Sequence, residues 1–104
     1  MNWNTLENKT LIRAILALET ADEARHFLRD LMTEGELKEF AKRLQTAELL
    51  SQNVSYSDIE AKTGFSSTTV ARVSKWLNAG EGGYKTVISK LHHHNSIQAR
   101  RGLS

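Results

Sequence analysis

The side chains best suited to chemistry lie close together in residues 64–77, which read GFSSTTVARVSKWL. A glycine and a row of hydroxyl residues come first, and apolar positions at helical spacing follow with basic residues between them. In the first turn of a helix, hydroxyls and free backbone amides can bind phosphates or the edges of bases. Ser67, Thr68 and Thr69 therefore predict a surface for nucleic acid, beside the positive charges of Arg72 and Lys75.

The residues around this stretch predict a helix-turn-helix at about residues 55–79. Gly64 supplies the positive φ that a tight turn needs, and Ser55 and Ser66 can cap the two helices. Crossing helices must touch at the apolar or small positions Ile59, Thr63, Phe65, Val70 and Val73. In such a motif the second helix enters the major groove of DNA. A helical hairpin whose hydroxyls only cap its helices would share this spacing and bind no DNA.

The charge is unevenly divided along the chain. The 104 residues carry a net charge of +2, but residues 1–60 sum to −4 and residues 61–104 to +6. Glu81 is the only acidic residue of the second part. This asymmetry favours an anionic partner such as nucleic acid for the C-terminal part, with a solvated basic tail as the alternative.

The elements that must position these residues are all helical. The chain has no proline, and its apolar residues recur at helical spacing. Thr33 and Glu36 match a capping box that starts the third helix. The pattern predicts one all-α domain over residues 1–95, followed by a polar basic tail over 96–104. We expect helices at roughly 4–18, 21–32, 34–52, 56–63, 67–79 and 84–94.

Several classes of function are not indicated. The chain has no cysteine, which favours an intracellular protein, and no apolar run of membrane-spanning length. His92, His93 and His94 are consecutive, so in a helix they point in different directions and cannot converge on one metal ion. No nucleophile lies at a useful spacing from a base. We therefore expect no enzyme, cofactor, metal site or membrane span.

Two segments carry a resemblance to a known family. TEGELKEFAKRLQTAELL and the following SYSDIEAKTGFSSTTVARVSKWLNAG resemble the Trp repressor superfamily, and are most similar to its TrpR-related YerC-type proteins. The resemblance spans about residues 33–80. It implies a six-helix subunit and an intertwined homodimer with a shared core. It also implies paired helix-turn-helix units, one helical turn of DNA apart.

The resemblance assigns candidate residues unevenly. It places Ser57, Ser67, Thr68 and Ala71 near DNA. It also matches Thr33, Arg43 and Arg72 to the positions that hold the corepressor tryptophan in the Trp repressor. There Arg43 would lie near the ligand carboxylate and Arg72 against its indole. Arg72 could instead contact a phosphate or form an ion pair.

Two positions depart from the tryptophan-binding pattern. Val73 stands where the Trp repressor has Gly, and Trp76 where it has Ser. We therefore expect that tryptophan is not the effector. Instead, Trp76 and Val73 would fill the space of the ligand, with Trp76 near Arg72 or Arg43. The alternative is that Trp76 is a core residue facing the third helix.

The sequence thus predicts a sequence-specific DNA-binding regulator of transcription, in the manner of a repressor, that acts as a homodimer in the bacterial cytoplasm and on the nucleoid. Its DNA-contacting candidates are Ser57, Ser66, Ser67, Thr68, Thr69, Ala71, Arg72 and Lys75. Its candidate effector pocket comprises Thr33, Arg43, Arg72, Val73 and Trp76. The alternative function is a protein-interaction module whose DNA-binding surface is vestigial.

Overall fold

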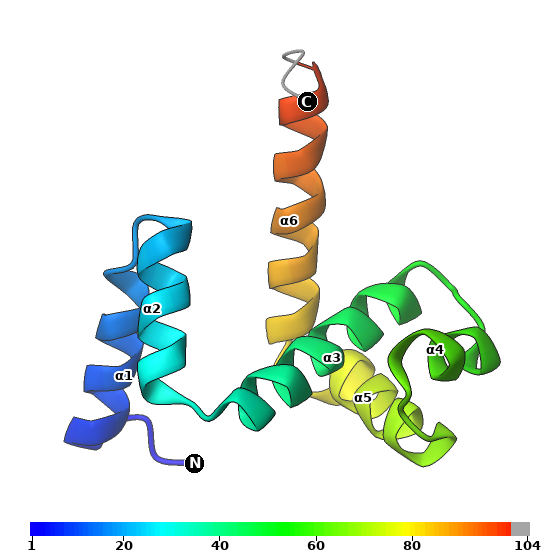
Figure 1. Ribbon diagram of the computed structural model, residues 1–104, viewed down its shortest axis with the longest axis horizontal. Coiled ribbons are helices and arrows are strands. Elements are labelled where there is room, and N and C mark those ends of the chain that lie inside the picture. Colours follow the sequence, from blue (N-terminus) through cyan, green and yellow to red (C-terminus); the bar gives the residue numbers. More distant parts are fainter. Residues whose placement is uncertain (101–104) are drawn as a thin grey trace. The chain divides into compact units, whose positions relative to one another are not determined.

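The computed structural model describes the backbone of residues 1–100 and the side chains of residues 1–93. These residues form helices and no strand, as the all-α prediction requires. In chain order the helices are α1 (Leu6–Leu16), α2 (Ala21–Leu31), α3 (Glu34–Ser51), α4 (Tyr56–Thr63), α5 (Ser67–Ala79) and α6 (Gly83–Arg100) (Figure 1). They fall into two compact units, Met1–Lys38 and a second unit that begins at Glu39.

Hydroxyl side chains start the first five helices. Thr5, Thr20, Ser55 and Ser66 each accept a hydrogen bond from a backbone N–H in the first turn of α1, α2, α4 and α5. The capping box predicted for α3 is confirmed. The Thr33 hydroxyl accepts from the Glu36 N–H at 3.1 Å, and the Glu36 carboxylate accepts from the Thr33 N–H at 2.9 Å. These caps satisfy amides that a helix start leaves without partners.

The predicted ends of the first and last helices need correction. α1 starts at Leu6 and not at residue 4, because Thr5 is its cap, and it ends at Leu16, two residues before the predicted end at 18. α6 continues to Arg100, past the predicted end at residue 94 and into the predicted tail. No glycine or proline interrupts residues 84–101, so nothing in the sequence stops the helix there. The remainder of the predicted tail, residues 101–104, lies outside the described residues.

The first unit leaves much of its apolar surface uncovered. Neither α1 nor α2 contains a buried residue. Ala14, Leu18, Phe27 and Leu28 are half-buried. Several large apolar side chains stay exposed, among them Leu11 at 37%, Ile12 at 41%, Ile15 at 48% and Leu31 at 49%. Such side chains gain free energy only when another surface covers them.

The second unit has a small core. Ala47 of α3, Val73 and Leu77 of α5, and Ile88 of α6 are buried together, and Leu44, Leu50 and Tyr84 pack against them. Ile59 of α4 and Val70 of α5 are also fully buried. The core therefore fixes α5, which holds most of the candidate DNA-binding residues, on the scaffold formed by α3 and α6 (Figure 1). Among the described residues, no helix is long and apolar enough to cross a membrane.

Candidate nucleic-acid interface

α4, the turn after it and α5 form the helix-turn-helix predicted from the sequence. Gly64 ends α4 with φ 78° and ψ 1°, in the left-handed region. A Cβ atom at Gly64 would meet nothing within 4 Å, so the backbone conformation and not crowding accounts for the glycine. Thr63 completes the turn: its hydroxyl donates to the Ile59 carbonyl at 2.8 Å and accepts from the Phe65 N–H at 3.2 Å. The bend between the helices is thus held by local hydrogen bonds.

The N-terminus of α5 uses only some of its hydroxyls for capping. Ser66 Oγ accepts from the Thr69 N–H at 3.3 Å and lies 3.1 Å from Thr69 Oγ1. Ser67 and Thr68 are exposed, and these capping bonds do not involve them. Of the predicted hydroxyls, Ser66 and Thr69 therefore shape the helix start, whereas Ser67 and Thr68 present their side chains to solvent.

One side of α5 is buried and the other is exposed and basic. Val70, Val73 and Leu77 face the core. Thr68, Ala71, Arg72 and Lys75, which are three or four positions apart along the helix, are all exposed. α5 contains no acidic residue, so its exposed side carries only positive charge. Ser57 at the start of α4 is also exposed, and its hydroxyl lies 3.3 Å from that of Ser55.

The candidate effector-pocket residues have different surroundings. The Arg43 guanidinium lies 5.3 Å from the ring centroids of both Phe40 and Trp76. Its Nε is also 3.5 Å from a carboxylate oxygen of Glu39. Trp76 faces α3 through this contact with Arg43. Because 40% of Trp76 is exposed, it is not a core residue. The indole therefore lies over Arg43, one of the two arginines named from the sequence.

The other residues of the candidate effector pocket take no part in the contact between Arg43 and the two aromatic rings. Val73 is fully buried in the core with Ala47. Arg72 is exposed on α5. Thr33 belongs to the first unit, where it caps α3. Sequence reasoning missed Glu39 and Phe40, although their spacing of three or four residues from Arg43 was a usable signal.

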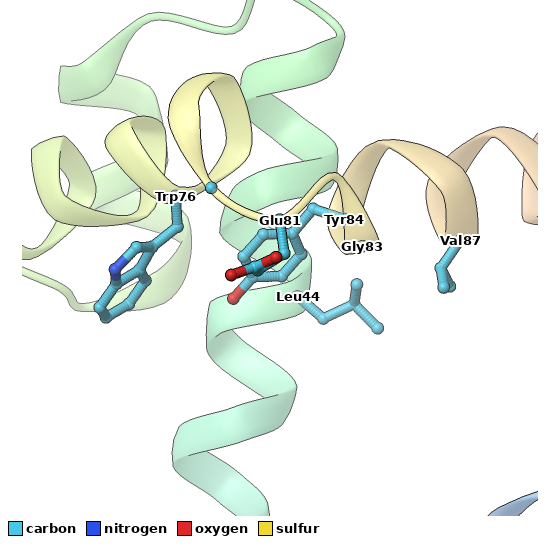
Figure 2. A pocket seen from close by; sticks show the side chains of 7 residues that line it. Leu44, Trp76, Glu81, Gly83, Tyr84 and Val87 are labelled. Carbon is cyan, nitrogen blue, oxygen red and sulfur yellow. The ribbon is translucent and has the colours of Figure 1, made fainter. Parts of the chain in front are cut away.

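An open apolar cleft of about 650 Å³ adjoins Trp76. Figure 2 shows the Trp76 indole at one end and Val87 of α6 at the other, with Glu81 and Tyr84 between them. Leu44, Gly80 and Gly83 complete the lining. This cleft could not be predicted from the sequence, because its walls come from α3, α5, α6 and the turn between α5 and α6, and their meeting depends on how the helices pack.

The histidines whose side chains are described do not form a metal site. Nε2 of His92 lies 3.3 Å from a carboxylate oxygen of Glu48, and this contact joins α6 to α3. His93 is exposed, and the His94 side chain lies outside the described ones. Within residues 1–93, no group of three or more histidine, cysteine, aspartate or glutamate side chains could hold a metal.

Comparison with known proteins agrees with this geometry. The chain matches the Trp repressor protein family model over residues 7–92. It belongs to the Trp repressor family. It is 35% identical over 81 residues to the uncharacterized protein YerC of Bacillus subtilis (strain 168), which covers 78% of each chain. The family resemblance seen in the sequence is thereby confirmed.

Solved structures confirm the six-helix TrpR-like fold. A TrpR-like protein from Eubacterium eligens ATCC 27750 superposes with a TM-score of 0.83 at 37% identity, covering 86% of this chain and 93% of that one. A structure described as a putative Trp repressor from Staphylococcus aureus gives a TM-score of 0.82 at 30% identity, covering 88% and 95%. The helix-turn-helix therefore lies in a fold shared with these proteins.

Proposed function

We propose that this protein is a sequence-specific, DNA-binding regulator of transcription, and that it acts as a repressor. The observation that supports this most is the exposed side of α5, where Thr68, Ala71, Arg72 and Lys75 lie together on a helix fixed by its core. A helix that presents hydroxyl and basic side chains from a rigid turn suits the major groove. Ser57 and Ser67 lie beside this face as further contacts, and Ser66 and Thr69 shape the helix start.

The experiment that tests this proposal separates base reading from phosphate binding. We expect Thr68→Ala to change the base preference of the protein, because Thr68 is exposed in the first turn of α5. Lys75→Ala should weaken binding to all duplexes alike and reduce the slope of log affinity against log salt by about 1. Fluorescence anisotropy on a panel of labelled duplexes measures both quantities. Unchanged preference in Thr68→Ala, together with altered preference in a variant far from α5, would place the recognition helix elsewhere.

The regulator acts, in this proposal, as an intertwined homodimer. The uncovered Leu11, Ile15 and Leu31 of the first unit support it, as does the apolar cleft beside Trp76. A second copy would supply matching apolar helices and cover both surfaces. Interfaces of obligate homodimers resemble a domain core cut in half. If the protein did not bind DNA but still dimerised, the interaction-module function would be favoured.

The effector, if there is one, is not tryptophan in this proposal. Two observations support this: Val73 is buried, and the Trp76 indole lies over Arg43, where it could take the place of a ligand indole. Arg72 then faces DNA phosphates. A family of transcription regulators also gives no reason to expect catalysis. We place the protein in the bacterial cytoplasm, on the nucleoid when it is bound to DNA.

A further inference from the structure

Lys42 of α3 reaches the turn of the helix-turn-helix although it is distant in sequence. Its Nζ lies 5.9 Å from the ring centroid of Phe65. Phe65 is half-buried and directly precedes Ser66, the cap of the recognition helix. The ammonium group of Lys42 therefore lies over the ring of the residue that directly precedes the cap of α5.

The backbone under Lys42 is well fixed. The hydroxyl of Thr46, one turn later on α3, is fully buried and donates to the Lys42 carbonyl at 2.8 Å. The neighbouring Ala47 belongs to the core that holds Val73 of α5. Lys42 thus projects from a rigid segment, and the Phe65 ring limits the directions that its long side chain can take.

Lys42 also differs from the other cations of α3. Lys38 lies 3.3 Å from Glu34, and Arg43 lies 3.5 Å from Glu39. Among the side chains of residues 1–93, no carboxylate lies within ion-pair distance of Lys42. Its charge is exposed and remains available to an anion.

We propose that Lys42 binds a backbone phosphate of the DNA that α5 reads, and that Phe65 positions it. This inference rests on the proposed function. When the N-terminal residues of a recognition helix touch base edges, the turn before it lies close to the phosphates that border the groove. Lys42 would then anchor the α3 scaffold to the DNA backbone and fix the register of α5 without reading sequence.

Salt-dependent affinity for a fixed duplex tests the role of Lys42. Lys42→Gln should weaken all duplexes by a similar factor and reduce the salt slope by about 0.9 for each subunit bound. Lys42→Arg should keep the slope. Lys38→Gln is the matched control, since it removes the same charge one turn earlier, and it should leave the slope unchanged. If Lys42→Gln lowered thermal stability but kept the wild-type slope, Lys42 would only support the turn and the inference would be wrong.

A double-mutant cycle tests the role of Phe65. We expect Phe65→Leu to weaken DNA binding by about two- to fivefold in the wild type, as loss of an exposed cation–π contact would. In the Lys42→Gln background the same change should have almost no effect, because the two residues act as a pair. Equal losses in both backgrounds would overturn the positioning role.

The same measurements separate this inference from the proposed function. If the wild-type protein showed no salt-dependent DNA binding at all, the proposed function itself would fail. If the wild-type protein bound DNA and Lys42→Gln bound it with the same affinity and salt slope, only the inference about Lys42 would be refuted.

Discussion

At the scale of single residues, the main question is what Trp76 does beside Arg43. The guanidinium lies 5.3 Å from the ring centroids of both Phe40 and Trp76. Glu39 balances its charge at 3.5 Å. A cation–π contact of this kind contributes roughly 0.5–2 kcal/mol, so it can hold α5 against α3 without a ligand. In the proposed function, this contact takes the place of a bound corepressor.

This arrangement predicts that L-tryptophan neither binds nor regulates the protein. Calorimetric titration of L-tryptophan should give no saturable heat, and DNA affinity should be the same with and without it. Trp76→Ser should weaken DNA binding while circular dichroism still reports a folded protein, because α5 loses its contact with Arg43. Trp76→Phe, which keeps a ring, is the control and should retain most of the affinity. Saturable tryptophan binding that raised DNA affinity would contradict this account.

At the scale of elements, short-range signals in the sequence were reliable. The caps at Ser55, Ser66 and Thr33 and the left-handed Gly64 follow from local chemistry, and each is present. The contacts of Lys42 with Phe65 and of Arg43 with Trp76 join residues that are over twenty positions apart. Helical periodicity gives the inward side of each helix but not its crossing with another, so the cleft and these pairs could not be predicted in detail.

The capping box of α3 predicts a pH dependence. The hydrogen bond from the Thr33 backbone N–H, and then that from its side chain, lower the pKa of Glu36 below its ordinary value. Because the folded-state pKa is depressed, the stabilisation is complete above the pKa of the unfolded chain and is lost as pH falls through the folded-state pKa. Thr33→Val should raise the pKa of Glu36, measured by NMR titration of its carboxyl carbon. Because valine keeps the backbone N–H, only the part due to the hydroxyl is removed, and an identical titration in both proteins would show that the Thr33 hydroxyl does not stabilise the carboxylate.

At the scale of the whole molecule, the two units differ in how much they bury. The second unit has a core, whereas α1 and α2 contain no buried residue. Helical periodicity predicts that Leu11, Ile15 and Leu31 lie on the apolar sides of their helices, but it does not predict which surface packs against them. That depends on packing between helices that lie in different units or subunits. The proposed homodimer would cover these residues.

The homodimer predicts that stability depends on concentration. If no stable folded monomer exists, the midpoint of unfolding should rise with protein concentration. Ile15→Glu, at a position that is 48% exposed in the single chain, should dissociate or unfold the protein, although an exposed substitution usually costs no more than about 0.5 kcal/mol. Thr10→Glu on the same helix is the charge-matched control and should have little effect. A compact, folded monomer in sedimentation at micromolar concentration would refute the interlocked dimer.

The central claim is that two copies of α5 read DNA together, and selection of bound sequences from a random duplex pool tests it most directly. A two-fold dimer should enrich inverted half-sites whose centres lie about 10 bp, or a small multiple of that, apart. Thr68→Ala should shift the enriched bases at symmetric positions in both half-sites. Enrichment of a single, unpaired half-site would contradict the dimer, and absence of any enriched sequence would contradict the proposed function.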